Sequence, residues 1–392
     1  MTSIKDISFI NKKALIRVDF NVPFNGNSIS DNSRILAAIP TINYVLENGG
    51  SCIVMSHLGR PKKRDKKLSL LRIKQELERL LDRVVIFVED CIGPEVKKAS
   101  ETLKPGQVLL LENLRFYKEE VDGDEKFAEE LSFLADIYVN DAYGTTHRAH
   151  ASTSTIAKYF TKKSPGLLLQ KEILSLKKVL ESPKKPVTAI VGGAKVSSKI
   201  SIIVNMLKVI DNLVIGGGMA YTFILNLGGK VGDSICEPEN LGDCQEILDQ
   251  AKKKNVRIFL PLDVVVSKSF SNNDKQKEVD IQNIPVGWQG LDIGRKTRKK
   301  FSDVIKQSNT ILWNGPMGVF EMSSFQKGTK AVANAVAVAT KKGSFSLVGG
   351  GDSVAAVKKF NLKDKMSFIS TGGGAMLESL EGKVLPGIKA LQ

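Results

Sequence analysis

"FSLVGGGDS", at residues 345–353, joins an apolar strand pattern to three consecutive glycines and an aspartate. A glycine turn lets the backbone approach a ligand closely, and a helix that follows the turn offers free N–H groups to an anion. Similar combinations of strand and glycine turn occur at 187–195 (VTAIVGGAK), 212–220 (NLVIGGGMA) and 368–375 (FISTGGGA). In open parallel sheets, ligands bind at the carboxyl ends of the strands, so these turns predict a nucleotide-binding edge.

The alternation of strand, turn and helix continues through all 392 residues. Further strands are expected at 13–22, 51–59, 84–90, 107–113, 135–142, 257–266 and 310–318, and helices at 35–50 and 70–81. Strands that alternate with helices predict βαβ units with parallel pairing, and a chain of this length suits two domains. The expected fold class is therefore α/β, with two Rossmann-like domains, each a mainly parallel sheet flanked by helices.

The segment 165–182 separates the two series of strands. Its apolar residues recur at helical spacing, lysines occupy the other face, and the prolines of SPKKP at 182–186 end the pattern. Two interpretations stay open at this point. The segment is either a helix that connects two domains or an ordinary surface helix of one of them.

The composition is that of a globular protein, with 42% hydrophobic and 25% charged residues. No apolar run approaches the roughly 18 residues that a membrane span needs. The first residues show neither the apolar stretch nor the cleavage site of a signal peptide. We therefore expect a cytoplasmic protein without a membrane partner.

Cysteine and histidine are few and dispersed along the chain. They are Cys52, Cys91, Cys236, Cys244, His57, His147 and His150. There is no C-x-x-C pair, and a structural zinc site would require clustered Cys and His. Isolated thiols in a reducing compartment are the better interpretation.

The net charge of +15 has two possible explanations. Lysine and arginine neutralise the phosphates of nucleic acids, which would make the chain a basic nucleic-acid-binding protein. The basic residues are dispersed, however, and the aromatic content of 6% is low for a protein that stacks on bases. A lysine-rich surface that attracts small anionic substrates is therefore the favoured explanation.

Two familiar phosphate-binding signatures are missing. The chain contains neither G-x-x-x-x-G-K-[ST] nor the G-x-G-x-x-G that a dinucleotide-dependent dehydrogenase would require. Asp352 directly follows the glycines at 349–351, where a carboxylate could either cap a helix or hold Mg²⁺. The spacing alone favours the cap.

Polar and basic side chains stand at or just after strands in the first half of the chain. They are Arg17, Asp19, Asn21, His57, Arg60, Arg115 and Arg148, and Arg34 opens the helix after the first strand. Several arginines at strand ends favour a cradle for a phosphate and a carboxylate, because guanidinium binds both in bidentate geometry. Taken singly, each arginine could equally form a surface salt bridge, and His57 could be a structural histidine.

Eight segments, in order and over nearly the whole chain, resemble the phosphoglycerate kinase family. They are RVDFNVP, SHLGRP, LLENLRFYKEE, NDAYGTTHRAHAST, GGAKVSSKI, WNGPMGVFE, GGGDS and STGGGA…LEGKVLPG. The resemblance implies reversible in-line transfer of a phosphoryl group from 1,3-bisphosphoglycerate to MgADP, which gives 3-phosphoglycerate and MgATP without a protein nucleophile. It also implies a monomer that acts on small molecules and requires no nucleic acid.

The resemblance assigns the phosphoglycerate substrate to the first half. The implied substrate-binding residues are Asp19, Phe20, Asn21, Arg34, His57, Leu58, Gly59, Arg60, Arg115 and Arg148. Arg60, Arg115 and Arg148 correspond to the basic patch that holds the phosphate that is not transferred. Arg34 corresponds to the arginine that reaches the migrating phosphoryl group.

The nucleotide is assigned to the second half. The implied nucleotide-binding residues are Gly193, Lys199, Gly216, Gly217, Gly218, Asn314, Glu321, Gly350, Gly351, Asp352 and Ser353. Lys195 and Lys199 correspond to lysines that face the nucleotide phosphates, and with Arg34 they are the implied catalytic residues. Glu321 corresponds to the residue that holds the ribose, and Asp352, together with the nucleotide phosphates, to the Mg²⁺ ligand.

The resemblance also implies a domain order. Residues 1–167 would bind 3-phosphoglycerate, 168–185 would form the interdomain helix, 186–375 would bind the nucleotide, and 376–392 would return to the first domain. Domain closure about a hinge that includes 165–186 would bring the substrates in line and expel water.

The sequence departs from the family pattern at three places. Ser198 stands between Lys195 and Lys199, where the family usually has aspartate, so the orientation of the two lysines is in question. Arg295 and Lys296 replace a usual Pro-Lys, and the segment 68–76 lacks a common proline.

Overall fold

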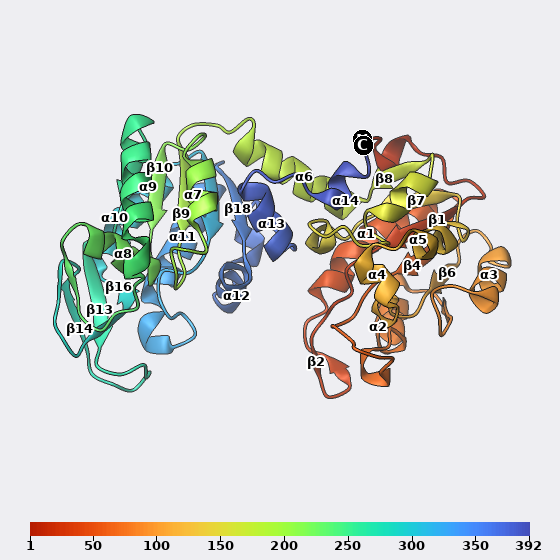
Figure 1. Cartoon of the computed structure of the whole chain (residues 1–392), viewed down its shortest axis with the longest axis horizontal. Coiled ribbons are helices and arrows are strands. Elements are labelled where there is room, and N and C mark those ends of the chain that lie inside the picture. Colours follow the sequence, from red (N-terminus) through yellow and green to blue (C-terminus); the bar gives the residue numbers. More distant parts are fainter. The chain divides into compact units, whose positions relative to one another are not determined.

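Two compact units form in the chain, and the computed structural model describes all of residues 1–392 (Figure 1). The first unit consists of Met1–Leu174 together with Val384–Gln392, and the second of Ser175–Lys383. The chain passes from the first unit to the second within helix α6 (Leu167–Leu180), and it passes back between Lys383 and Val384. The helix expected at 165–182 is therefore present.

A six-stranded parallel sheet forms the centre of the first unit, in the order β5-β6-β4-β1-β7-β8. Its strands are β1 (Lys13–Arg17), β4 (Ser51–Met55), β5 (Val85–Phe87), β6 (Val108–Leu110), β7 (Ile137–Asn140) and β8 (Lys163–Pro165). β1 lies in the middle, paired with β4 on one side and with β7 on the other. Because the pairs are parallel, the loops that follow these strands leave from one edge of the sheet.

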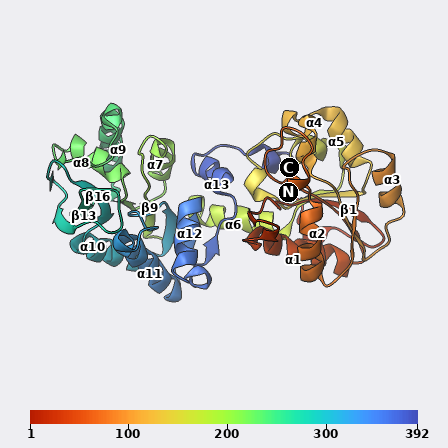
Figure 2. The same cartoon turned by 90° about the horizontal axis from the view of Figure 1, so that it is seen from below.

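Helices cover both faces of this sheet. Figure 2 shows α1 (Ser33–Glu47) and α2 (Leu71–Leu81) on one side of β1, and α4 (Lys118–Asp122) and α5 (Glu125–Ser132) on the other. The remaining helix between strands is α3 (Pro94–Glu101). The buried residues of α2 recur every fourth position, at Ile73, Leu77 and Leu81, which is the spacing of one helix face.

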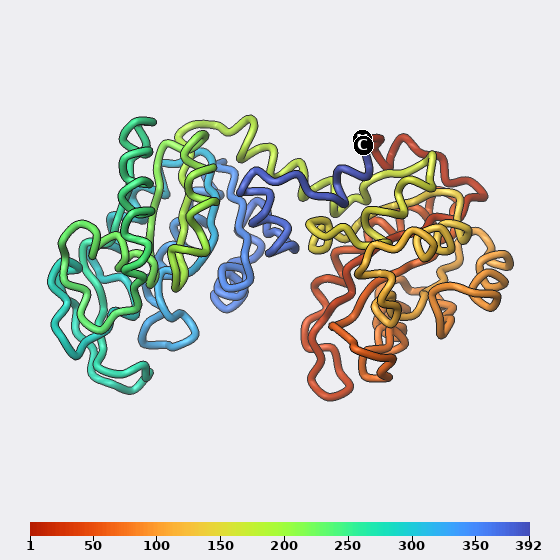
Figure 3. Tube along the Cα trace, in the orientation of Figure 1, coloured from red at the N-terminus to blue at the C-terminus, as the bar shows by residue number.

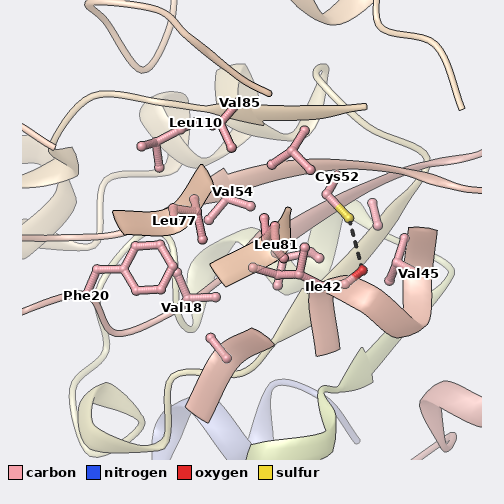
Figure 4. Packing of buried hydrophobic residues seen from close by; sticks show 14 of the residues in the cluster. Val18, Phe20, Ile42, Val45, Cys52, Val54, Leu77, Leu81, Val85 and Leu110 are labelled. Atoms are coloured by element: carbon pink, nitrogen blue, oxygen red, sulfur yellow. Dashed lines mark hydrogen bonds between the residues drawn. The ribbon is translucent and has the colours of Figure 1, made fainter. Parts of the chain in front are cut away.

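The core between α1, α2 and the sheet is apolar and closely packed (Figure 4). Ile42 of α1 and Leu77 of α2 lie in one cluster with Cys52 and Val54 of β4, and all four are fully buried. Phe20, in the loop after β1, closes the same core at the edge where the loops leave the sheet. The Cys52 thiol donates a hydrogen bond to the Ile42 carbonyl at 3.7 Å, so this cysteine is a structural residue.

Both ends of the chain belong to the first unit, as the trace in Figure 3 shows. The last helix, α14 (Pro386–Lys389), is tied to it by the Gly387 amide, which donates to the Thr146 carbonyl at 2.8 Å. The short elements of this unit are the hairpin β2 (Phe24–Asn25) and β3 (Ser28–Ile29) and the 3₁₀ helices η1 (Ile4–Asp6), η2 (Lys66–Leu68), η3 (Leu114–Phe116), η4 (Tyr143–Thr145) and η5 (Thr155–Tyr159).

The second unit has its own six-stranded parallel sheet, in the order β12-β10-β9-β17-β18-β19. Its strands are β9 (Val187–Val191), β10 (Asn212–Ile215), β12 (Arg257–Phe259), β17 (Thr310–Asn314), β18 (Phe345–Gly349) and β19 (Phe368–Ile369). Each of the four predicted strands with a glycine turn supplies one strand, namely β9, β10, β18 and β19. The glycine turns consequently lie at one edge of this sheet, as expected.

Helices also cover both faces of the second sheet. In Figure 2, α7 (Ile200–Met206), α8 (Met219–Asn226) and α9 (Leu241–Lys253) lie on one side, and α10 (Arg295–Lys306) and α11 (Lys327–Lys341) on the other. Trp313 of β17, Phe301 of α10 and Val332 of α11 are buried together in the core of that second side. The unit also contains α12 (Gly351–Lys359), α13 (Gly373–Leu380) and the 3₁₀ helices η6 (Pro238–Asn240), η7 (Ser323–Phe325) and η8 (Lys363–Lys365).

One predicted strand is wrong. The stretch 257–266 forms two strands, β12 and β13 (Asp263–Ser267), which belong to different sheets. Pro261 lies between them and cannot donate a ladder hydrogen bond, so the chain leaves the parallel sheet there. β13 instead pairs antiparallel with β14 (Gln276–Asp280) and β16 (Gln289–Ile293), and a further short pair joins β11 (Lys230–Val231) to β15 (Asn283–Ile284). The fold class is otherwise confirmed as α/β with two mainly parallel sheets flanked by helices.

Candidate functional sites

The predicted substrate residues of the first unit gather at the loop edge of its sheet. Arg17 ends β1 and Met55 ends β4, and the two are register partners. The residues just beyond them therefore meet: Nδ1 of His57 lies 3.9 Å from Oδ1 of Asp19. Neighbouring parallel strands that end together explain why two motifs 38 residues apart in sequence form one cluster.

Backbone hydrogen bonds hold the two loops against each other. The Phe20 amide donates to Ser56 Oγ at 2.8 Å, and the Gly59 amide donates to Asn21 Oδ1 at 2.9 Å. The side chains of Phe20 and Leu58 are buried in the core. Among the predicted substrate residues, these two therefore shape the loops and do not present polar groups.

Gly59 is required by its backbone and its surroundings. Its φ is +66°, and an added Cβ would lie 2.8 Å from Cδ2 of Leu68. A side chain here would be strained and would press on its neighbour. The amide and carbonyl of Gly59 are thereby fixed where Asn21 and Arg115 bind them.

Arg34 reaches this cluster from the start of α1. Its Nη1 donates to Oδ2 of Asp19 at 2.8 Å, and its side chain remains 38% exposed. Nη1 is thus anchored by Asp19, while the other N–H groups of the guanidinium can still bind an anion. Asp19 orients Arg34 and balances part of its charge.

Arg115, in η3, has the most unusual surroundings of the predicted arginines. Its Nη1 donates to the Gly59 carbonyl at 2.7 Å, but its buried Nε has no acceptor in the protein. Burial, with repulsion from Arg17 and Arg148, lowers the pKa of Arg115 to about 10. A buried N–H without a partner in the protein, close to two further cations, is suited to bind an anion.

Arg148 and Arg60 differ in how firmly they are held. Arg148 is half-buried, bonds His147 through Nε at 3.1 Å, and is close enough to perturb Arg115. Arg60 is exposed to solvent in the loop after β4. The structure therefore brings Asp19, Arg34, His57, Arg115 and Arg148 into one cluster. Arg60 follows His57 by three residues in the same loop, and its side chain is exposed.

A layer of buried polar residues lies beneath these arginines. None of its members is among the residues predicted from sequence to bind a ligand. It consists of Arg17, Tyr138, Glu120, His150 and Ser152, each at most 5% exposed. Arg17 stands out in the sequence as a strand-end residue, but nothing there shows that it is buried. Glu120 and Ser152 carry no sequence signal of such a role, because their meeting depends on the packing of α4 against the 146–154 loop.

The two buried histidines of this region, His57 and His150, should make stability depend on pH. Burial, followed by repulsion from Arg17 and Arg115, lowers the pKa of His57 well below its usual value. Burial and the same arginines lower the pKa of His150 to about 3. Unfolded histidine takes up a proton near pH 6.5, so below that pH the native state binds fewer protons than the unfolded chain. The stabilisation is complete above about pH 6.5 and is lost as the pH falls.

Urea titrations followed by circular dichroism at pH 7.5, 6.5 and 5.5 will measure this effect. For each histidine that stays neutral in the native state, the unfolding equilibrium constant should rise about tenfold for every pH unit by which the pH falls below 6. The His150→Gln variant should show a slope smaller by about one proton. An unchanged slope in that variant would mean that His150 is protonated in the native state.

Five of the predicted nucleotide residues line a pocket of about 370 Å³ in the second unit. They are Gly193, Gly217, Gly218, Glu321 and Asp352, so the turns after β9 and β10, the loop after β17 and the start of α12 meet there. The rest of the lining is mostly apolar and includes Tyr221, Ile235, Phe270, Leu291, Met317 and Val319. Sequence reasoning missed these residues, because apolar side chains from distant segments carry no signal that distinguishes a pocket wall from a core.

The glycine turns have two different roles. Gly217 has a φ of +69°, and an added Cβ would lie 2.7 Å from the amide nitrogen of Gly193, so the two turns touch through bare backbone. Gly216 is buried beneath the pocket, where a Cβ would collide with Sδ of Met317. Of these glycines, Gly216 thus supports the floor and does not line the pocket.

Lys199 is held by the end of β17. Its Nζ donates to Oδ1 of Asn314, whose Nδ2 donates to the Gly349 carbonyl at 2.9 Å. Burial lowers the pKa of Lys199, and the nearby carboxylate of Asp352 opposes that change. Asn314 therefore orients Lys199, and the carboxylate of Asp352 lies near enough to act on the charge of its ammonium group.

The start of α12 corrects the interpretation of Asp352 as a helix cap. Gly350 is the N-cap residue, with a φ of +90°, and Asp352 lies in the first turn without a capping hydrogen bond. The carboxylate is exposed and faces the pocket. Ser353 is buried, and its Oγ accepts from the Gly315 amide at 2.6 Å, so it joins two loops.

The loop that carries Lys195 and Lys199 is held without the usual aspartate. Ser198 Oγ donates to the Lys195 carbonyl at 3.0 Å, and Ser197 donates to Glu237 through both its amide, at 3.0 Å, and its hydroxyl, at 2.7 Å. Lys195 is exposed. The carboxylate that fixes this loop is therefore Glu237, from another segment.

The chain has neither a preformed metal cluster nor a membrane-spanning helix. No group of three or more His, Cys, Asp or Glu side chains is placed to hold a metal ion. No helix has the length and apolar character needed to cross a membrane.

Comparisons with known proteins agree with one another. A sequence model of the phosphoglycerate kinase family matches residues 4–383. A curated phosphoglycerate kinase from Moorella thermoacetica is 51% identical over 390 residues, which cover 99% of this chain and 98% of that protein. A structure of phosphoglycerate kinase from Coxiella burnetii superposes with a TM-score of 0.92 at 40% identity, and one from Pyrococcus horikoshii with 0.85 at 33%; each match covers 100% of this chain and 98% of the other. The chain has an arginine-rich cluster on one parallel sheet and a glycine-lined pocket on the other, and these matches cover nearly its full length. It therefore belongs to the phosphoglycerate kinase family.

Proposed function

We propose that the cluster of the first unit binds 3-phosphoglycerate and that the pocket of the second unit binds the nucleotide. The unpartnered Nε of Arg115 is the observation that supports the first assignment best. Arg115, Arg148 and Arg60 would hold the phosphate that is not transferred, because guanidinium pairs with phosphate in bidentate geometry. Asp19, Asn21 and His57 would contact the body of the substrate.

Arg34 would face the acyl phosphate of the same ligand. Its anchoring by Asp19 leaves part of the guanidinium exposed, so it can bind an oxygen whose charge grows during transfer. A donor that is already oriented costs no reorganisation when that charge develops.

The pocket of the second unit suits a nucleotide. Its apolar walls would take the base, Glu321 the ribose hydroxyls, and the glycine turns with Lys195 and Lys199 the phosphates. Gly350, Gly351 and the first turn of α12 would add backbone N–H groups to the phosphate site.

Asp352 fits the role of a Mg²⁺ ligand. Mg²⁺ is usually bound through one or two carboxylates together with substrate phosphates, and Asp352 is an exposed carboxylate that lines the pocket and lies near Lys199. The lack of a cluster of three ligands is consistent with a metal that arrives with the nucleotide as MgADP or MgATP. When bound, Mg²⁺ would supply positive charge to the phosphate oxygens.

The chain is a kinase that acts on small molecules, and the proposed residues explain how it would do so. Transfer from 1,3-bisphosphoglycerate to ADP is in line and spreads charge over the equatorial oxygens, so positioning and electrostatics do most of the catalytic work. Arg34, Lys195 and Lys199 would stabilise that charge. No protein nucleophile is required.

Three further properties belong to the same proposal. The reaction requires two ligands bound by separate units to meet, so we expect hinge bending about α6 when both are present. Small-angle scattering will test this, since a radius of gyration that does not change on addition of both ligands would contradict it. The protein is also expected to be a cytoplasmic monomer.

A coupled assay with 1,3-bisphosphoglycerate and MgADP tests the function directly. ATP should form at a rate that disappears when EDTA removes Mg²⁺ and returns when Mg²⁺ is added in excess. Reduction of a nicotinamide dinucleotide in place of ATP formation would support a dehydrogenase. Tight, salt-sensitive binding to RNA without ATP formation would support a nucleic-acid-binding protein.

A further inference from the structure

Arg17 is fully buried, and each nitrogen of its guanidinium contacts a neighbour in the first unit. Its Nε donates to Ser152 Oγ at 2.8 Å, and its Nη1 donates to the Val18 carbonyl. Its Nη2 lies 3.3 Å from Nδ1 of His57. Because the guanidinium is held at three points, it has no freedom to reach a substrate.

The buried carboxylate of Glu120 fixes the orientation of Ser152, which is the partner of Arg17 Nε. Ser152 Oγ donates to Oε1 of Glu120 at 2.7 Å, and the Ser152 amide donates to Oε2 at 2.9 Å. Nη2 of Arg17 lies 3.8 Å from the same Oε1. The single proton of the Ser152 hydroxyl is committed to Glu120, so that oxygen can only accept from Arg17.

The direction of the last hydrogen bond follows from chemistry. A guanidinium donates and has no acceptor, so Nδ1 of His57 must be the acceptor in its contact with Arg17. A neutral imidazole that accepts at Nδ1 carries its proton on Nε2.

We propose that Arg17 is a positioning residue that fixes His57 as the neutral Nε2–H tautomer, so that His57 offers the substrate one N–H donor and no charge. The tautomer follows from the ligand-free structure alone. Only the nature of the acceptor, an oxygen of the phosphoglycerate, rests on the proposed function.

The charges around His57 support a neutral ring. Arg17 faces it from β1, Arg34 from α1 and Arg115 from η3, and His150 faces it from the loop after η4. The carboxylate nearest to the ring is that of Asp19, 3.9 Å from Nδ1, and it is already bound to Arg34. Protonation of Nδ1 would place a new cation against Arg17, which the geometry opposes.

In the cluster of the first unit, charge and hydrogen-bond direction are thereby supplied by different residues. The arginines supply the charge that binds phosphate, and His57 supplies a directed donor whose state does not change with pH over the working range. A histidine with an ordinary pKa would gain and lose charge near pH 6.5 and would alter the affinity for an anionic substrate.

Nitrogen-15 NMR of the histidine rings tests the proposal in the wild-type protein without ligand. The chain has three histidines, and the His147→Gln and His150→Gln variants assign the three ring systems. The His57 ring should show the shift pattern of the Nε2–H tautomer, unchanged from pH 8 to pH 5.5. An Nδ1–H pattern, or protonation of this ring between pH 7 and 6, would overturn the proposal.

A double variant then tests whether Arg17 is the cause. Arg17→Met with Glu120→Gln removes the buried pair together, so that no unpaired charge is left behind. The His57 signals should become a mixture of tautomers that titrates toward pH 6.5, and KM for 3-phosphoglycerate should acquire the same pH dependence, with a rise of about tenfold at pH 8. The control is Arg298→Met with Glu278→Gln, which removes an ion pair of the second unit and contacts no histidine; it should change neither readout.

The outcomes distinguish this inference from the proposed function. If the double variant keeps the Nε2–H tautomer and KM rises equally at every pH, Arg17 is merely structural and the proposal is overturned. If the double variant does not fold, the wild-type spectrum alone decides. If the wild-type tautomer is as expected but 3-phosphoglycerate does not shift the His57 signals, this inference stands and the assignment of the substrate cluster fails.

Discussion

An Arg34→Ala variant should lose about 10²- to 10³-fold in kcat, with a much smaller rise in KM for the phosphoglycerate substrate. Arg34 is held by Asp19 at 2.8 Å with its side chain 38% exposed, so it is placed to bind an oxygen that gains charge in the transition state. The phosphate that is not transferred would still be bound by Arg115 and Arg148. Steady-state kinetics in both directions of the reaction will measure the two constants.

Two further variants control this experiment. Arg34→Lys keeps the charge but not the fork geometry, so it should recover only part of kcat. Arg79→Ala removes an exposed arginine of α2 in the same unit and should leave both constants unchanged. If Arg34→Ala raised KM and left kcat intact, Arg34 would contribute uniform binding and its catalytic role would be refuted.

A Lys199→Met variant should show a loss of similar size, about 10²- to 10³-fold in kcat. Asn314 fixes the ammonium group of Lys199, and Asp352 lies nearby, which places a cation where the nucleotide phosphates are expected. Methionine removes the charge and keeps the length of the apolar stem. The Kd for 3-phosphoglycerate should not change, because that ligand is assigned to the other unit.

Lys208 offers a control in the same unit, since it is exposed and bonds only Asn205 in this structure. Lys208→Met should have wild-type kinetics. A Lys199→Met variant with normal kcat, or with weakened binding of 3-phosphoglycerate measured by calorimetry, would argue against the division of the two ligands between the units.

Much of the fold could be predicted from sequence because its signals are local. An apolar strand that ends in a glycine turn is visible in a short window, and four such windows supply β9, β10, β18 and β19. The stretch 257–266 has the same appearance but is broken at Pro261. Its second half pairs antiparallel with residues 9 to 29 positions downstream, and no local pattern shows that choice of partner.

The substrate cluster could be predicted to the extent that it follows from strand order. Asp19 and His57 meet because β1 and β4 are neighbours and end together. The burial of Arg17 and its meeting with Glu120 could not be predicted in this way. They depend on how α4 and the 146–154 loop pack against the end of β1, which is a tertiary property.

The pocket of the second unit could likewise be predicted only in part. Its glycines and charged residues stand out in the sequence, but its apolar lining does not. Asp352 shows how a local rule fails: its position after three glycines suggests a cap, whereas Gly350 takes the N-cap position and leaves the carboxylate exposed to the pocket.

A crystal structure with 3-phosphoglycerate and a nucleotide bound together would be the most direct test of two anion sites, one in each unit. We expect phosphoglycerate oxygens at Nε of Arg115 and at Nε2 of His57, and nucleotide phosphates at Lys199 and the first turn of α12. Electron density for both ligands in the same unit would contradict this expectation.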